Sequence, residues 1–268
     1  MRFLLATDGS RGASVAEDFL LALPLGCGDE VTVLTTPTVS EREAYALLTR
    51  VHWRFAARHI PVTTAIRQGA PAEAAEAVAL ERASDVIVVG SRGLGQWSGT
   101  LLGSVSRAVA RNAPASVLVV RARRDAPRNV VLAIDGSEDA RTAVRLMETL
   151  PLPTSAAVEL LRLDEPGQDR LCDMAVDRAR IVLGARLVNV STAGWDHAGE
   201  SVLRHAMITR TDLIVLGARG QTIGTGLMRT SIADHVLSHA HCAVLIAKPP
   251  VVTRRIEVPA FVPAAFAP

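Results

Sequence analysis

The chain carries one pattern twice, and this repeat limits the folds that are open to it. The segment "FLLATDGS" at 3–10 returns as "VVLAIDGS" at 130–137, and "DVIVVGSRG" at 85–93 returns as "DLIVLGARG" at 212–220. A third block, "ASVLVVR" at 115–121, returns as "CAVLIAK" at 242–248, and the offset is always 127 residues (132 − 5 = 127). Copies of this length are domain-sized, so the repeat indicates a duplicated domain rather than a solenoid.

We therefore expect two domains, over residues 1–124 and 128–248. The joint "RARRDAPRN" is charged and contains a proline, which is typical of a linker, and its arginines, Arg121 included, are expected to be solvated. The remaining segment, 249–268, carries five prolines and little periodicity, so we expect an extended or disordered tail.

Strand and helix patterns alternate within each copy. In the first copy the expected strands are Phe3–Thr7, Glu30–Thr36, Val62–Arg67, Asp85–Val89 and Ser116–Val120, and the expected helices are Ala13–Leu23, Glu41–His59, Pro71–Arg82 and Gly103–Arg111. Continuously apolar strands that alternate with helices predict an α/β fold. Each repeated domain is then a five-stranded, mainly parallel sheet with helices on both faces, and ligands bind such sheets at the carboxyl ends of the strands.

Composition narrows the classes of partner. Hydrophobic residues make up 49% of the chain, enough for a core, whereas aromatic residues make up only 3%, too few for a base-stacking platform. With 29 basic and 27 acidic residues, we expect neither a nucleic acid nor a membrane as partner. Three scattered cysteines, no leader-like segment and no long apolar run predict a soluble, cytoplasmic protein.

A glycine-rich loop follows the fourth expected strand. The stretch "VVGSRGLGQWSGTLLGSVSR" (88–107) places five glycines within fourteen residues, directly before a helix. Glycine lets backbone N–H groups close on a ligand, and a helix start adds unpaired donors and a partial positive charge. The loop therefore predicts an anion site, most naturally for phosphate, with further donors from Arg92, Ser104 and Ser106. It contains no Walker GK[ST], and no G-x-G-x-x-G follows the first strand.

The first expected strand ends in "ATDGS", which permits two interpretations. Asp8 would lie at the carboxyl edge of the sheet, where its carboxylate could accept hydrogen bonds from ribose hydroxyls or hold a metal that screens phosphates. Alternatively, Asp8, Gly9 and Ser10 only form a turn and cap the following helix. The sequence leaves both open.

These segments together resemble the universal stress proteins in their tandem two-domain form. The ATP-binding members share the pattern G-x2-G-x9-G-[S/T], which Gly90, Gly93 and Gly103-Ser104 complete. The strand ends "ATDGS" and "AIDGS" and the stretch "RQGAPAEAAEAVALERASDVIVVGSRG" are also similar to the family. The resemblance covers about 1–248 and implies a Rossmann-like fold of the nucleotide-binding α-hydrolase-like type.

The resemblance also implies function. It implies ATP with Mg²⁺ bound in the first copy, Asp8 serving the nucleoside and the glycine loop the phosphates. It implies a stress regulator with at most slow hydrolysis, domains paired through strands 116–120 and 242–246, and an unknown regulatory protein partner, and it allows a homodimer. The implied contacts are Ala6, Thr7, Asp8, Thr36, Gly90, Arg92, Gly93, Gly103, Ser104, Val105 and Ser106.

The second copy departs from the pattern. Gly217-Ala218-Arg219-Gly220 is intact, but after nine residues Thr230 stands where glycine is expected. A β-branched side chain would crowd the phosphates, yet threonine can also cap a helix and donate its hydroxyl. Whether this copy binds a nucleotide stays open; its candidate contacts are Ile134, Asp135, Gly217, Arg219, Gly220, Thr230 and Ser231.

Two other functions are compatible with parts of the sequence. The chain could be a nucleotide-independent interaction or scaffold module, in which the loop only shapes a docking surface. It could also be an adenylating or pyrophosphate-releasing enzyme, although "ATDGSRGAS" only partly resembles the loop that such an enzyme needs. We expect no catalytic residue and no metal site. Although His235, His239 and His241 cluster and Asp234 is adjacent, no acidic or cysteine ligand stands at helical spacing beside them. The tryptophans Trp53, Trp97 and Trp195 are expected to be packing anchors.

Overall fold

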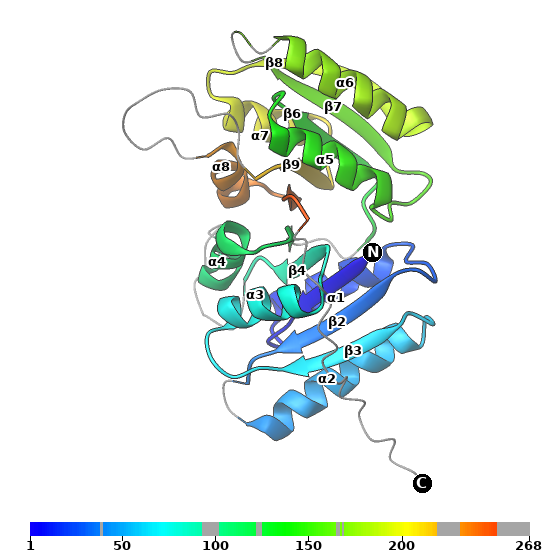
Figure 1. The fold of residues 1–268 in the computed structure, drawn as a ribbon, viewed down its shortest axis with the longest axis vertical. Coiled ribbons are helices and arrows are strands. Elements are labelled where there is room, and N and C mark those ends of the chain that lie inside the picture. The colour runs from blue at the N-terminus through cyan, green and yellow to red at the C-terminus, as the bar shows by residue number, and fades with distance from the viewer. Residues whose placement is uncertain are drawn as a thin grey trace.

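The computed structural model describes residues 1–37, 40–92, 102–121, 125–164, 167, 169–218 and 231–250. Its strands form one ten-stranded sheet in the order β3-β2-β1-β4-β5-β10-β9-β6-β7-β8 (Figure 1). Residues 1–121, here the first half, contribute β1 (Arg2–Ala6), β2 (Glu30–Thr35), β3 (Val62–Ile66), β4 (Val86–Gly90) and β5 (Ser116–Val120). Residues 125–250, the second half, contribute β6 (Asn129–Ile134), β7 (Ala157–Asp164), β8 (Leu187–Gly194), β9 (Leu213–Gly217) and β10 (Ala243–Ala247).

The helices follow the repeat as well. They are α1 (Arg11–Ala22), α2 (Glu41–Ala56), α3 (Pro71–Glu81), α4 (Ser104–Asn112), α5 (Glu138–Thr149), α6 (Asp169–Leu183), α7 (Ala198–Ile208) and α8 (Ile232–His239), with a short 3-10 helix at Gly184–Arg186. One apolar layer of the core joins the sheet to α1, α2, α5 and α6, and the other joins it to α3, α4, α7 and α8. The predicted α/β fold with helices on both faces is therefore confirmed.

The two halves join through their last strands. All neighbouring strands are parallel except β5 and β10, which pair antiparallel, with Leu118 opposite Leu245 and Val119 opposite Val244. Both strands are buried along their whole length, so each covers the edge that the other would expose. The predicted pairing of the last strands is present. The strands of the first half therefore point in the opposite direction to those of the second half. As a result, the carboxyl ends of the first-half strands lie at the same edge of the sheet as the amino ends of the second-half strands.

Two expectations about single residues are wrong. Arg121 is only 8% exposed, because it leaves the end of β5 at the junction of the halves rather than entering a solvated linker. Trp53 is 62% exposed on α2 and anchors no core, whereas Trp195 is partly buried and packs against the core layer that includes α7 and α8. Trp97 and residues 251–268 of the expected tail lie outside the described residues. None of the helices within the described ranges has the length and apolarity needed to cross a bilayer.

Candidate functional site

Hydrogen bonds tie the start of α4 to the end of β4. The Ser91 N–H donates to the Val120 carbonyl (2.8 Å), and the Gly103 N–H donates to the Ser91 carbonyl (2.9 Å). The buried Ser106 hydroxyl donates to the Gly90 carbonyl at 2.6 Å. Its single proton is thereby used within the protein, so the expectation that this hydroxyl donates to a phosphate is wrong. The Ser106 side chain instead fixes α4 against the sheet.

The N-terminus of α4 has no side-chain cap. Gly103 is the N-cap residue and offers no side-chain acceptor to the first amides of the helix. The first turn contains no acidic residue, and Ser104 and Val105 are exposed there. The first N–H groups of a helix lack intrahelical acceptors and carry a partial positive charge, so this end of α4 suits an anion.

Two arginines add positive charge at the same edge. Arg121 follows β5 and donates through its guanidinium to the Leu237 carbonyl of α8, while its Nε has no hydrogen-bond partner. Burial lowers the pKa of Arg121, and the nearby charge of Arg92 lowers it further. Within the described ranges, neither guanidinium forms an ion pair with a carboxylate. Sequence reasoning missed Arg121, although the repeat aligns it with another basic residue, Lys248.

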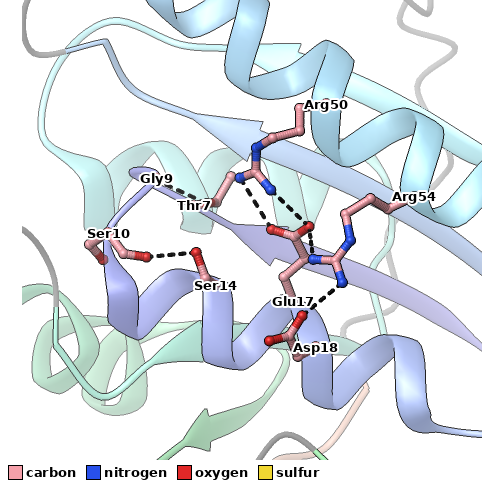
Figure 2. Close-up of polar contacts among 8 residues, drawn as sticks. All are labelled: Thr7, Gly9, Ser10, Ser14, Glu17, Asp18, Arg50 and Arg54. Carbon is pink, nitrogen blue, oxygen red and sulfur yellow. Dashed lines mark hydrogen bonds and ion pairs between the residues drawn. The ribbon is translucent and has the colours of Figure 1, made fainter.

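The turn after β1 has the geometry of the second interpretation, in which Asp8, Gly9 and Ser10 form a turn and cap the following helix. The Asp8 carboxylate accepts from the Ser10 N–H (2.9 Å), and the Ser10 hydroxyl accepts from the Ala13 N–H (3.2 Å) and so caps α1. The Thr7 hydroxyl accepts from the Gly9 N–H at 3.3 Å (Figure 2). Asp8 is only partly buried, so the turn and cap leave part of its side chain accessible.

The sheet brings most of the predicted first-half contacts to one edge. Since β1 lies between β2 and β4, the residues that end these strands are neighbours. Thr36 follows β2, and the Thr7 N–H donates to the Leu34 carbonyl at 2.9 Å. The contacts gathered at this edge are Ala6, Thr7, Asp8, Thr36, Gly90, Arg92, Gly103, Ser104, Val105 and Ser106. Gly93 lies outside the described residues.

Gly90 has a packing role that the sequence reasoning did not assign to it. A Cβ on Gly90 would lie 2.3 Å from the Gly12 carbonyl oxygen, and a Cβ on Gly12 would lie 2.0 Å from the Arg92 carbonyl oxygen. Both positions therefore need glycine for α1 to rest against the end of β4. Sequence reasoning assigned Gly90 to the phosphates and overlooked Gly12.

A buried carboxylate links α1 to α2. Glu17 of α1 is fully buried and pairs with Arg54 and, at 3.4 Å, with Arg50, both of α2 (Figure 2). Arg54 also pairs with Asp18 at 2.7 Å. These pairs hold α2 beside the turn after β1, where the Leu47 side chain lies 3.4 Å from the position of a Cβ on Gly9.

The corresponding turn of the second half is closed. A Cβ on Gly136 would lie 2.9 Å from the Cys172 backbone nitrogen, so α6 packs directly on the turn. The Cys172 thiol lies 3.8 Å from the Ile134 carbonyl oxygen and 4.0 Å from that of Leu163, between the ends of β6 and β7. Burial raises the pKa of Cys172 to about 11. Asp135 accepts from the Ser137 N–H (3.0 Å) and is buried.

Ion pairs occupy the end of β7. Arg162 stands at the repeat position of Thr35 (35 + 127 = 162). It pairs with Asp164, Asp169 and Asp173, which surround its guanidinium. The first half has the neutral Thr35 and Thr36 at this place, so the end of the second strand differs between the halves in charge.

The start of α8 also differs from that of α4. Ser231 is the N-cap, and its hydroxyl accepts from the Asp234 N–H at 3.0 Å. Ser231 and Asp234 stand at the repeat positions of Ser104 and Arg107. The helix end in the second half is thus capped and acidic, where that of the first half is uncapped and flanked by arginine. Arg219, Gly220 and Thr230 lie outside the described residues, and Gly217 packs on α5 beside Asp139.

Comparison with known proteins decides the family. The model of the universal stress protein family matches residues 1–121 and 178–248. The chain belongs to the universal stress protein family. A universal stress protein of Mycolicibacterium smegmatis is 26% identical over 192 residues, which cover 63% of this chain and 63% of that relative. One of Mycobacterium tuberculosis is also 26% identical over 192 residues, which cover 61% of each chain.

The match thus spans about three fifths of the length of these curated universal stress proteins. The crystal structure of a universal stress protein from Archaeoglobus fulgidus superposes with a TM-score of 0.71 and 20% identity, over 92% of this chain and 98% of that one, and shows the same fold. The family match omits 122–177, the segment that contains Asp135, Arg162 and Cys172.

Proposed function

We propose that this universal stress protein binds ATP with Mg²⁺ at the carboxyl edge of its first half and acts as a regulator in stress adaptation. One observation carries the proposal: the uncapped start of α4 lies at the same edge as two arginines that have no carboxylate partner within the described residues. Such an arrangement is stabilised by a bound polyanion. The complete ATP-binding glycine pattern of the family supports the same conclusion.

The phosphates belong at the start of α4 in this proposal. The backbone N–H groups of Ser104, Val105 and Ser106 would donate to them, and the exposed Arg92 would add a charge-assisted contact. Gly93 completes the pattern in sequence. Because Ser106 uses its hydroxyl on Gly90, it contributes through its amide alone.

The nucleoside belongs at the ends of β1 and β2. The partly buried Asp8 carboxylate can accept hydrogen bonds from ribose hydroxyls, and Thr36 lies at the neighbouring strand end. Mg²⁺ is usually held by one or two carboxylates together with substrate phosphates, and Asp8 fits that donor set. Once bound, the ion would screen phosphate charge. Binding rather than turnover is the function proposed.

The second half, by contrast, is proposed to bind no nucleotide, so one ATP is expected per chain. Its turn after β6 is covered by Cys172, and the end of β7 is filled by the Arg162 ion pairs. The start of α8 is capped by Ser231, and Asp234 would repel a phosphate. Isothermal titration of the intact chain tests this stoichiometry directly.

The decisive variant is Gly103→Val. Gly103 has an ordinary φ of −62°, and its Cβ would lie 3.2 Å from the Ser91 carbonyl oxygen, so a small shift accommodates a side chain. The branched side chain would then cover the first amides of α4 while the fold persists. We expect at least a roughly 100-fold loss of ATP affinity, or about 3 kcal/mol, measured by titration beside the wild type and after acid extraction of co-purified nucleotide.

Ser231→Ala is the matched control in the second half. Removal of this N-cap should lower the free energy of unfolding by about 1 kcal/mol and leave ATP affinity unchanged. Absence of nucleotide from the purified wild type, together with no binding by titration, would instead favour the nucleotide-independent interaction module. Pyrophosphate release with a carboxylate substrate would favour the adenylating enzyme.

A further inference from the structure

Each half of the molecule holds the last helix of the other half through the same repeat position. Arg121 and Lys248 correspond (121 + 127 = 248), and each directly follows the last strand of its half. The Lys248 ammonium donates to the carbonyls of Ala113 (2.8 Å) and Arg111 (3.2 Å) at the end of α4. The Arg121 guanidinium donates to the Leu237 carbonyl near the end of α8. Both side chains thus satisfy helix carbonyls that lack intrahelical partners.

Lys248 is held firmly in place. Its backbone N–H lies 3.2 Å from the Ser116 hydroxyl oxygen, and its carbonyl oxygen lies 3.4 Å from the same oxygen. Ser116 begins β5, and β5 pairs with β10, the strand that Lys248 follows. The backbone of Lys248 therefore stays beside the end of α4, within reach of its ammonium group, unless the junction between the halves changes.

The helix that Lys248 holds is the one to which we assign the phosphates. Helix α4 has nine residues, so it is only about 13 Å long. Its first turn is attached to the sheet through Gly103 and Ser106, and its last turn is attached to Lys248. The last turn also carries Arg111, whose exposed side chain pairs with Asp234 of α8 at 3.4 Å, and the buried Ala110. Loss of the Lys248 attachment leaves the last turn with fewer contacts, so the short helix can tilt more readily about its first turn. Hydrogen bonds weaken steeply with angle and distance, so a small tilt would weaken the contacts of its amides with a ligand.

We propose that Lys248 is a positioning residue for the nucleotide site of the first half. This inference rests on the proposed ATP site. It also gives the second half a role, because a domain that binds no nucleotide itself holds α4 in the orientation that binds the nucleotide. Lys248 itself would lie roughly a helix length away from the phosphates and would not touch them.

Lys248→Met and Lys248→Arg, made in the full chain, test the proposal. Methionine keeps the apolar stem and removes the donor, whereas arginine keeps a donor and the charge. We expect about fivefold weaker ATP binding for Lys248→Met and near wild-type affinity for Lys248→Arg. Hydrogen exchange of the amides of 104–112 should accelerate in Lys248→Met, with 232–239 unchanged. Arg178→Met, which removes an exposed pair with Glu148 in the second half, is the control and should change neither measurement.

Several results would overturn the inference. They are wild-type ATP affinity in Lys248→Met, equal weakening in Lys248→Met and Lys248→Arg, and unchanged exchange over 104–112. Failure of the proposed function looks different, because the wild type then binds no ATP. Faster exchange of α4 in Lys248→Met would in that case still support the hold of Lys248 on the helix, and unchanged exchange would refute it.

Discussion

The two halves share one strand order and yet begin their last helices in opposite ways. Helix α4 starts at Gly103 without a cap and carries Arg107, whereas α8 starts at Ser231, which caps it, and carries Asp234. The apolar strand residues that build the sheet are kept in both halves. Ser104 and Arg107 are exposed, so packing of the core does not require the two helix starts to match.

The turns after β1 and β6 also differ between the halves, in what packs on them. In the first half, Asp8 is partly accessible, and among the residues that the structure describes only the Leu47 side chain approaches Gly9. In the second half, the backbone of α6 packs on Gly136, and Cys172 lies between the two strand ends. A side chain can move aside for a ligand, but a helix backbone cannot, so we expect the closure of the second half to be permanent.

The largest predicted effect is a difference in thiol reactivity. Burial raises the pKa of Cys172 to about 11 and that of Cys242 to about 12, whereas Cys27 is exposed. The reactive thiolate is therefore nearly absent from the two buried cysteines at pH 8. We expect Cys27 to react with a disulfide reagent at least about a thousandfold faster than Cys172 in the native protein. Rapid reaction of Cys172 would show that the second half opens.

The same raised pKa gives the sign of a pH effect. A thiol whose folded pKa lies above the unfolded value of 9.0 loses its stabilising contribution as the pH rises toward about 11. The free energy of unfolding should therefore fall between about pH 9 and pH 11, and Cys172→Ala should reduce that fall.

A second prediction concerns the buried Glu17 carboxylate of α1, which pairs with arginines of α2. Glu17 is fully buried, and the second half has the apolar Val144 at the same repeat position (17 + 127 = 144). Among the described residues, Arg54→Met would leave Glu17 only its long contacts with Arg50 at 3.4 and 3.5 Å, so the free energy of unfolding should fall by about 2 kcal/mol. Glu17→Leu, which makes the position resemble the second half, should cost less. Urea denaturation measures both, and the opposite ranking would contradict the prediction.

A third prediction, with a smaller effect, exchanges the charged residues at the starts of α4 and α8. Arg107→Asp gives α4 the acidic residue of α8, which should weaken ATP binding about tenfold, and more at low salt because screening is then weaker. Asp234→Arg is the reverse exchange. It should create no second site, because Ser231 still caps α8 and α6 still covers the turn. A second bound ATP in Asp234→Arg would refute the closure of the second half.

Much of the fold was predictable from the sequence because its signals are local or periodic. Apolar runs predicted β5 at Ser116–Val120 without error, and Pro71 predicted the start of α3. The repeat predicted equivalent elements in both halves and the meeting of β5 with β10. The candidate contacts Asp8, Gly90 and Gly103 followed from strand ends and glycine spacing, which a parallel sheet brings to one edge.

What the sequence by itself determined about this protein is its repeated α/β framework and the sheet edge at which its candidate contacts meet, because hydrophobic periodicity and glycine spacing are properties of neighbouring residues. Only the tertiary structure decided that Arg121 is buried, that Ser106 bonds to Gly90 and that Cys172 closes the second half. Each of these outcomes depends on what packs opposite a side chain. That partner comes from a distant part of the chain, and no local pattern specifies it.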